Sequence, residues 1–577
     1  MSTPEPDSTS ASSWSNPERI RRYRERVFDE RARLRGAFPE AVHHQQRVLA
    51  DLLAFNAGTE YGRAHGFGQI RTLRDFKRAV PIQDYAALAP WIDRVAAGEA
   101  NVLSADKPAV FFTSSGSTGA HKKIPVTPRF MKTTFFPFFY AAWAPLIEDF
   151  PDILARTDAV LNLKHDPLSA PPLTASGQPH VGASQVDFGK FFGEPLSSEP
   201  GTQAPWATLP VEVAANVHLE KMYLRLRLAV QRDIRCVIGI NPAMVAAIPY
   251  QLNLWWPRIV KEVRDGTLGG VPYGAPDPAE AARLERLAAQ PSGVRPRDVW
   301  PNMRALFLWT SGLASLYLPR VQAEFGAAVS ALPAPSAASE GPVGVTLDRH
   351  PRAGSLVVTA SVYEFVDADA DLAPGVETIE QHELEVGRDY HVIFSHVGGF
   401  YRYAVGDVVR VVDRVEGVPR VEYAGRNTRS DAAGERLRDA QVIRAMATAL
   451  DGTGLEARNA ACRVQSTPAP DGPALHYEFA ISGHAPWSRD AAQRFAARLD
   501  AALGDEAPGY RRARVRGQLQ AASITQLDGD AFHRDWHEAI RAGVRPTQVK
   551  DRLFRQDPDL WRRLTDANTS PQSGGSR

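Results

Sequence analysis

The sequence predicts an α/β fold with a large N-terminal domain and a smaller α+β domain at the C-terminus. Helix-like and strand-like patterns follow one another between residues 109 and 163, as they do in α/β folds. The polar segment 426–431, which has few apolar residues, has the character of a hinge between domains. With 577 residues the chain is also too long for one ordinary core, so at least two domains are expected.

We divide the chain into four parts on this basis. Residues 1–15 are rich in Ser and Pro and are predicted to be disordered. The N-terminal domain is predicted to cover residues 16–426, and the C-terminal domain residues 427–567. The Ser- and Gly-rich tail at 568–577 is predicted to be disordered as well.

Two helices are predicted to open the N-terminal domain. The first begins at Asn16-Pro17-Glu18, which combines an N-cap residue, a first-turn proline and an acid near the positive helix end. The second covers residues 41–56 and carries a row of apolar residues. His43 and His44 lie on it with no third ligand at metal-binding spacing, so we interpret them as ordinary helix residues.

The most informative stretch is a loop predicted at residues 113–123, directly after a short buried strand at 109–112. Gly116 and Gly119 let the backbone turn tightly and aim N–H groups at an anion. Five hydroxyl side chains add neutral donors: Thr113, Ser114, Ser115, Ser117 and Thr118. A lysine, for which we select Lys123, supplies positive charge, so a polyphosphate is the natural ligand.

Two other interpretations of this loop were weighed. A Walker A loop is excluded, because Ile124 follows the lysines where that pattern requires Ser or Thr. A plain surface loop rich in Ser and Gly stays open as the alternative when the stretch is taken alone.

The remaining elements follow from apolar periodicity and turn residues. Helices are expected at 219–231, 435–450 and 490–503, and Asn241-Pro242 is expected to cap another. Strands are expected at 234–240, 305–309, 327–332, 355–365, 390–395, 408–412, 421–425 and 475–482. Residues 166–210 are rich in Pro, Gly and Ser and are expected to be irregular or to form a lid.

Composition and charge exclude several classes of protein. The 67 basic and 66 acidic residues give a net charge of +1, which does not favour nucleic acid or an anionic membrane as a partner. The two cysteines, Cys236 and Cys462, indicate a reducing compartment rather than a disulfide framework. Neither a signal peptide pattern nor an apolar run long enough to span a bilayer is present. We therefore expect a cytoplasmic protein, and a monomer.

Three motifs stand in order along the chain: the loop at 113–123, Ala338-Ser339-Glu340, and Tyr401-Arg402-Tyr403 followed by Gly406-Asp407. Their order and spacing resemble those of the acyl-adenylate-forming enzymes. A closer resemblance is to the plant auxin-responsive acyl-acid amido synthetases, the Gretchen Hagen family, and their bacterial relatives. It is carried also by Lys123-Ile124-Pro125, Tyr363-Glu364-Phe365 and Ser430-Asp431 with Gly434-Glu435-Arg436-Leu437, and it runs from about residue 45 to residue 552.

The resemblance implies a role for each motif. Asp407 corresponds to a carboxylate that accepts two hydrogen bonds from the ribose of ATP, although a plain turn residue is the alternative. Glu340 corresponds to the acid that holds Mg²⁺ against the phosphates, although it could simply cap a helix or loop. Further ATP contacts are implied for residues 113–119, Ser339, Tyr401 and Arg402. For Arg402 and for the tyrosines, a packing role is nearly as plausible.

Two positions depart from the family pattern. Ser336 stands where relatives carry a tyrosine near adenine, so adenine must stack on another group or bind more weakly. Arg436 stands where relatives often carry lysine. Lys550 is the other basic residue that the resemblance offers for phosphate contact, and we assign it the catalytic role in adenylation in preference to Arg436.

The resemblance implies a two-step ligase that uses ATP and Mg²⁺. A carboxylic acid is first converted to acyl-AMP with release of pyrophosphate in the N-terminal domain, and the acyl group then passes to an amine, expected to be an amino acid. The C-terminal domain is implied to rotate between the two steps. An acyl-CoA synthetase and a nucleotide-binding protein without catalysis are the alternatives. Apolar residues at 135–143 suggest an acyl pocket, although such a run is more often core.

Overall fold

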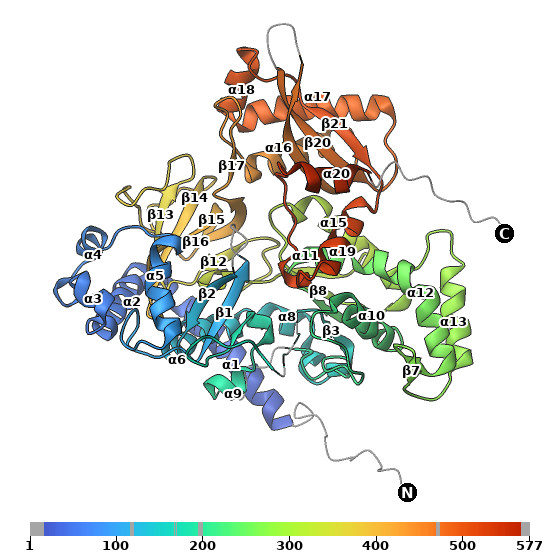
Figure 1. Cartoon of the computed structure of the whole chain (residues 1–577), viewed down its shortest axis with the longest axis horizontal. Helices are drawn as coiled ribbons and strands as arrows, with labels where there is room; N and C mark the ends of the chain where they lie inside the picture. Colours follow the sequence, from blue (N-terminus) through green and yellow to red (C-terminus); the bar gives the residue numbers. More distant parts are fainter. Residues whose placement is uncertain are drawn as a thin grey trace, which may run out of the picture.

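The computed structural model describes residues 17–115, 121–164, 166, 168, 170–193, 200–468 and 474–566. Among the described residues, three sheets of three or more strands and their helices make up most of the larger N-terminal part, and a further three-stranded sheet lies in a separate lobe (Figure 1). Among the helices of the described residues, none is both long enough and apolar enough to cross a lipid bilayer. The mixed α/β class predicted from the sequence is confirmed.

Helices form the first hundred residues. They are α1 (Pro17–Gly36), α2 (Ala41–Asn56), α3 (Glu60–Ala64), α4 (Leu73–Ala79) and α5 (Tyr85–Ala97). The bounds of α2 agree with the prediction, and α1 begins at Pro17 as expected. Thr72 and Asp75 form a capping box at the start of α4, and Gly98 ends α5 in the left-handed conformation.

A small sheet, in the order β2-β1-β4, follows these helices. Its strands are β1 (Val110–Ser115), β2 (His121–Val126) and β4 (His180–Val181). β1 and β2 are antiparallel, with Ser114 opposite Lys122 and Thr113 opposite Lys123. The predicted loop 113–123 is therefore strand at both ends, and the two lysines lie on β2.

A parallel sheet in the order β3-β5-β8-β9 forms the second core of the N-terminal part. It consists of β3 (Val160–Asn162), β5 (Cys236–Ile238), β8 (Ala305–Leu308) and β9 (Ser330–Pro333). The helices of this region are α10 (His218–Ala229), α11 (Pro242–Ala246), α12 (Ile248–Asp265), α13 (Pro278–Ala288), α14 (Pro296–Val299) and α15 (Ala314–Phe325). Asn241 caps α11 as predicted, its side chain accepting a hydrogen bond from the Ala243 N–H.

Short elements connect these two sheets. They are α6 (Pro128–Phe130), α7 (Phe136–Ala141), α8 (Ala144–Asp149) and α9 (Phe188–Phe192), while a separate hairpin of β6 (Thr267–Leu268) and β7 (Val271–Pro272) lies between α12 and α13. The aromatic residues of α7 are buried. Residues 166–210, expected to be irregular, contain only short elements where the structure describes them.

A seven-stranded sheet carries the remaining motifs in the order β10-β11-β12-β16-β15-β14-β13. Its strands are β10 (Ser336–Ala338), β11 (Gly341–Val345), β12 (Gly354–Leu356), β13 (Val362–Asp367), β14 (Asp389–His396), β15 (Phe400–Val415) and β16 (Val418–Arg426).

Two predictions about this sheet were wrong. The single strand expected at 355–365 is two strands, β12 and β13. The turn expected before residue 408 is instead the middle of β15, which begins at Phe400. The backbone of β15 is left-handed at Arg402 and Gly406, and its register against β16 shifts beside Asp407. Such irregularities bend a strand and change the direction in which nearby side chains point.

The C-terminal lobe, which we define as residues 437–527, follows the short strand β17 (Arg429–Ser430). It contains β18 (Leu437–Arg438), α16 (Asp439–Thr453), β19 (Ala457–Thr467), β20 (Ala474–Gly483), α17 (Arg489–Glu506), α18 (Pro508–Val515) and β21 (Ser523–Leu527). The chain then returns to the N-terminal part with α19 (Ala531–Arg541), and α20 (Pro558–Asp566) follows. In Figure 1 α19 lies beside the helices of the parallel sheet, and Trp536 and Ile540 belong to their buried core.

Candidate active site

A cavity of about 380 Å³ opens where the seven-stranded sheet, the parallel sheet and the segment after α19 meet. Five of the predicted site residues line it: Thr113, Ser339, Glu340, Asp407 and Lys550. They come from β1, the β10–β11 turn, β15 and the segment that follows α19, and thus from both predicted domains. Gly116, Ser117, Thr118 and Gly119 lie outside the described residues, as do the side chains of Ser114 and Ser115.

Glu340 is a buried carboxylate at one wall of the cavity. It lies in the turn between β10 and β11 and is only 5% exposed. Its Oε1 accepts hydrogen bonds from the Tyr403 hydroxyl at 2.8 Å and from Lys122 Nζ at 3.3 Å. Burial, with the neighbouring charge of Glu340, raises the pKa of Tyr403, so this hydroxyl stays a donor. The carboxylate is thereby fixed in one orientation.

The lysine at this wall is Lys122 rather than Lys123. Lys122 lines the cavity and contacts Glu340, whereas Lys123 Nζ pairs with Asp93 at 2.8 Å on the other face of β2. Neighbouring strand residues point to opposite faces, so only one of the two lysines can enter the cavity. Strand alternation offered a signal, because Lys122 shares its face with the apolar Ile124 and Val126.

Asp407 lines the cavity and is ion-paired with Arg426. Its Oδ1 lies 3.2 Å from Arg426 Nε, yet within the described part of the chain it receives no hydrogen bond. Burial raises the pKa of this carboxyl, and the charges of Arg426 and Lys550 oppose that shift. The Asp407 side chain is 17% exposed at the cavity wall, so its carboxylate can accept hydrogen bonds from a ligand that brings hydroxyl groups.

Lys550 reaches the cavity from the segment between α19 and α20. Its Nζ lies 4.8 Å from the centre of the Trp309 ring. The segment is held to the N-terminal part by Asn241, whose Nδ2 donates to the carbonyls of Pro546 at 3.1 Å and Val549 at 2.8 Å. The side chain remains exposed to the cavity, while desolvation by the surrounding protein lowers the pKa of Lys550.

Arg436 does not line this cavity. It lies before β18 and forms an ion pair with Asp371, which is itself mostly exposed. Arg429 pairs with the same carboxylate at 2.8 Å. In this conformation the structure therefore brings Lys550, and not Arg436, to the other motif residues.

Arg402 and Tyr401 are packed into the interior instead of the cavity. Arg402 is 3% exposed, and its Nη2 lies 2.8 Å from Glu364 Oε2, a carboxylate that is 1% exposed. Its Nη1 donates to the carbonyls of Lys77 and Val80. The Tyr401 ring stacks on Tyr61 with a centroid distance of 4.9 Å. The packing interpretation of both residues agrees with this arrangement.

Two aromatic rings line the cavity near the position that lacks the family tyrosine. Ser336, on β10, is itself part of the lining. Trp309 donates its Nε1–H to the Pro335 carbonyl at 3.0 Å, which fixes the indole beside Ser336. Tyr423 on β16 lies against Gly312, where an added Cβ would come within 3.3 Å of the ring. Sequence reasoning did not single out these rings, since aromatic residues in strands are usually core.

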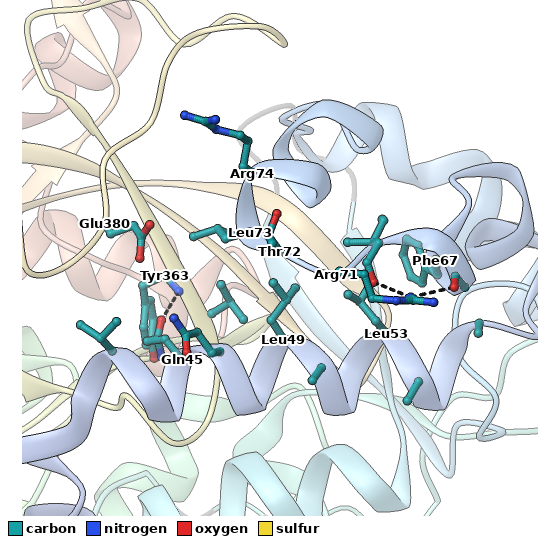
Figure 2. A pocket seen from close by; sticks show the side chains of 18 of the residues that line it. Gln45, Leu49, Leu53, Phe67, Arg71, Thr72, Leu73, Arg74, Tyr363 and Glu380 are labelled. Carbon is teal, nitrogen blue, oxygen red and sulfur yellow. Dashed lines mark hydrogen bonds between the residues drawn. The ribbon is translucent and has the colours of Figure 1, made fainter.

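A second, larger cavity of about 800 Å³ lies between α2, α4 and β13 (Figure 2). Apolar side chains of α2 form its floor, with Leu49 and Leu53 pointing into it, and Arg71 lies at the Phe67 end, where it donates to the carbonyls of Gly68 and Ile70. Gln45 accepts a hydrogen bond from the Tyr363 N–H at one end. None of the residues predicted for ATP, Mg²⁺ or catalysis lines this cavity.

The chain is similar to known proteins over most of its length. It matches the GH3 family N-terminal domain at residues 31–329, the GH3 family central domain at 354–426 and the GH3 family C-terminal domain at 440–558. It is 25% identical over 544 residues to the probable indole-3-acetic acid-amido synthetase GH3.2 of Oryza sativa subsp. japonica, covering 88% of this chain and 87% of that protein. It is 24% identical over 428 residues to the jasmonoyl--L-amino acid synthetase JAR6 of Nicotiana attenuata, covering 66% and 69%.

The fold has a counterpart among solved structures. AtGH3.15 acyl acid amido synthetase in complex with 2,4-DB superposes with a TM-score of 0.76, at 18% identity, over 93% of this chain and 95% of that one. The expected large N-terminal part and smaller C-terminal part are thus those of a known fold. The matched domains cover most of the chain in the expected order, so the protein belongs to the GH3 family.

Proposed function

We propose that the protein is an ATP-dependent acyl-acid amido synthetase, which activates a carboxylic acid as acyl-AMP and transfers the acyl group to an amino acid. The relatives named above are amido synthetases of this kind. The observation that carries the proposal is the set of groups lining one cavity: the Asp407 carboxylate, the fixed Glu340 carboxylate, and the ammonium groups of Lys122 and Lys550. We infer that the protein acts in the cytoplasm, and as a monomer.

Asp407 is proposed to bind the ribose of ATP. Asp407 lines the cavity, where its carboxylate can accept hydrogen bonds from the hydroxyls of a diol, and such charge-assisted bonds are among the stronger ones in proteins. Trp309 and Tyr423 are the two cavity rings on which adenine can stack. They offer the replacement for the tyrosine that is absent at position 336.

Glu340 fits Mg²⁺. The ion prefers one or two carboxylates together with phosphate oxygens, and Glu340 is an oriented carboxylate at the cavity wall. Across the described residues there is no group of three or more His, Cys, Asp or Glu that could hold a metal alone, so a single-carboxylate site requires the phosphates. When bound, the ion would neutralise phosphate charge. Glu340, held by Tyr403 and Lys122, would set its place.

The first step forms one bond and breaks one. An oxygen of the substrate carboxylate attacks the α-phosphorus of ATP, and the bond to the bridging oxygen breaks so that pyrophosphate leaves with the electron pair. Negative charge grows on the phosphate oxygens, and the ammonium groups of Lys122 and Lys550 are placed to stabilise it.

In the second step the amine nitrogen attacks the acyl carbon, AMP leaves with the electron pair of the C–O bond, and the amine proton passes to solvent.

A product analysis tests this proposal. The purified protein is incubated with ATP, Mg²⁺, a panel of carboxylic acids and pooled amino acids, and nucleotides and conjugates are separated by chromatography. AMP, pyrophosphate and an acid–amino acid amide are expected. ADP and phosphate as the main products would exclude adenylation. A thioester formed with added coenzyme A, and no amide with any amino acid, would reassign the acceptor.

A further inference from the structure

A group of buried cations surrounds one carboxylate beside the active-site cavity. Lys221 Nζ and Arg225 Nη2, both from α10, lie 3.3 and 3.4 Å from the same oxygen, Oδ1 of Asp166. The charges of Asp166 and Arg545 also act on each other. The charges of Asp166, Lys221, Arg225 and Arg545 all affect the pKa of His218. The lysine and the α10 arginine are only 10% and 7% exposed. We call these residues the Asp166 cluster.

The charges of this cluster do not balance among the described residues. Asp166 supplies one negative charge, while Lys221, Arg225 and Arg545 supply three positive charges. Burial lowers the pKa of Arg225 and of Arg545, because removal from water disfavours the charged form of both guanidinium groups. Buried charges in proteins are normally paired. An excess of positive charge within the cluster favours an anion as its ligand.

Arg545 connects the cluster to the cavity. It lines the cavity together with Lys164, and its Nη1 donates to Gln185 Oε1 at 2.5 Å. The guanidinium passes directly over Gly182, where an added Cβ would lie 2.1 Å from Nη1. Only glycine at position 182 leaves room for this placement. Of the three cluster cations, Arg545 is thus the one whose side chain a cavity ligand can touch.

The two cationic positions supplied by the segment 545–550 face different acids. Lys550 Nζ lies 4.8 Å from the centre of the Trp309 ring, and the charges of Asp407 and Glu340, the groups proposed for ribose and Mg²⁺, act on it. Arg545 lies against Gly182 and Gln185, and the charge of Asp166 acts on it. The phosphate chemistry therefore belongs to the Lys550 position, and the Arg545 position is left for another anionic group. A guanidinium suits a planar carboxylate because it can donate two parallel hydrogen bonds.

We propose that Arg545 binds the α-carboxylate of the amino acid that accepts the acyl group. The inference rests on the proposed function, which supplies an acceptor that always carries this carboxylate whatever its side chain. Binding there would balance part of the cluster charge and hold the amine at a fixed distance from the guanidinium. Arg545 is thus a determinant that selects amino acids over simple amines.

The test compares each amino acid with its carboxamide, which lacks the negative charge. Amide formation is measured for the wild type, Arg545→Gln and Arg541→Gln, the last being an exposed arginine of α19 that pairs with Glu538. We expect Arg545→Gln to raise KM for the amino acid about tenfold or more, as for a lost hydrogen bond to a charged group. KM for the carboxamide and pyrophosphate exchange should change little. Arg541→Gln should behave as the wild type.

A second measurement keeps the inference separate from the proposed function. The thermal stability of the wild type and of Arg545→Gln is measured in the presence of AMP with each amino acid and each carboxamide, because a ligand that binds the folded state raises Tm. We expect amino acids to stabilise the wild type more than Arg545→Gln. Amide synthesis by the wild type with an unchanged acceptor KM in Arg545→Gln would overturn the inference and leave the function standing.

Three other results would also overturn it. Selective loss of pyrophosphate exchange in Arg545→Gln would assign the arginine to the phosphates. A raised KM only for dicarboxylic acyl substrates would assign it to the acid. If no amide forms, equal stabilisation of the wild type and Arg545→Gln by every amino acid would count against the inference, whereas Arg545-dependent stabilisation would support it.

Discussion

Lys122 Nζ lies 3.3 Å from Glu340 Oε1, although the two residues are 218 positions apart in the sequence. The ammonium group thus sits at the carboxylate proposed for Mg²⁺, and it lies 5.0 Å from the centre of the Tyr85 ring. With this contact, the ammonium group and an Mg²⁺ ion at the proposed Glu340 site would both face the same polyphosphate. We therefore expect the ammonium group of Lys122, and not that of the neighbouring Lys123, to face the phosphates.

Lys122→Ala is expected to abolish most pyrophosphate exchange, because it removes a charge placed where the phosphate charge develops. Losing one such electrostatic contact costs about a hundredfold in rate. Lys123→Ala is the matched control, since its ammonium pairs with Asp93 outside the cavity and should leave exchange near the wild-type level. Full activity in Lys122→Ala together with loss in Lys123→Ala would show that β2 presents the other face to ATP.

Glu340→Gln is expected to lower adenylation and to raise the Mg²⁺ concentration that gives half-maximal activity. Glutamine keeps the shape of the side chain but removes the negative charge that attracts the cation. Excess Mg²⁺ should restore part of the activity, and a titration at saturating ATP measures it. Identical Mg²⁺ curves for the variant and the wild type would leave Glu340 without a metal role.

Sequence patterns predicted the class of the fold and much of the cavity lining, for identifiable reasons. α2 and the Asn241 cap follow from local periodicity and capping preferences, which depend on nearby residues alone. Thr113, Glu340 and Asp407 were found because their motifs have a fixed spacing.

Other features depend on contacts between residues far apart in the sequence, so they could not be predicted from neighbouring residues alone. The contact of Lys122 with Glu340 joins residues 218 positions apart in the sequence. Arg402 is expected at ATP because it matches the arginine of the family motif, yet its charge is satisfied by Glu364, 38 residues away. The return of α19 to the N-terminal core depends on packing against α10, which no local pattern encodes.

Arg402→Ala is expected to destabilise the protein rather than to weaken ATP binding directly. It would leave Glu364 as an unpaired charge that is 1% exposed, and breaking a buried pair from one side costs about 3–5 kcal/mol. Denaturant unfolding of the N-terminal part measures this loss. Wild-type stability in the variant with a large drop in nucleotide affinity would instead place Arg402 in the site.

The pH dependence of adenylation is expected to change in Lys550→Arg. Desolvation lowers the pKa of Lys550, so its ammonium form is present below that pKa and is lost as the pH rises through it. Arginine keeps its charge over the whole range. The alkaline fall in pyrophosphate exchange should therefore move to higher pH in the variant. If pyrophosphate exchange falls at the same alkaline pH in the wild type and in Lys550→Arg, a group other than Lys550 causes the fall.

The final prediction concerns Asn241, which links the N-terminal part to the segment that carries Lys550. Its Nδ2 donates to the carbonyls of Pro546 and Val549, and its Oδ1 caps α11. Asn241→Ser keeps a good helix cap but is too short to donate across the gap. Two hydrogen bonds of about 0.5–1.5 kcal/mol each would be lost from the conformation that places Lys550 in the cavity.

Asn241→Ser should therefore lower pyrophosphate exchange about fivefold or more, the factor that corresponds to about 1 kcal/mol. At saturating amino acid, where a weaker hold on Arg545 no longer affects the rate, amide formation from chemically prepared acyl-AMP should be nearly unchanged, because that step does not require Lys550 at the phosphates. Asn302→Ser, which loses only a bond to the partly exposed Asp233, is the control. If Asn241→Ser slows both half-reactions equally, the asparagine supports the fold of the cavity as a whole. If neither rate changes, the Trp536 and Ile540 packing of α19 is sufficient to hold Lys550 in place.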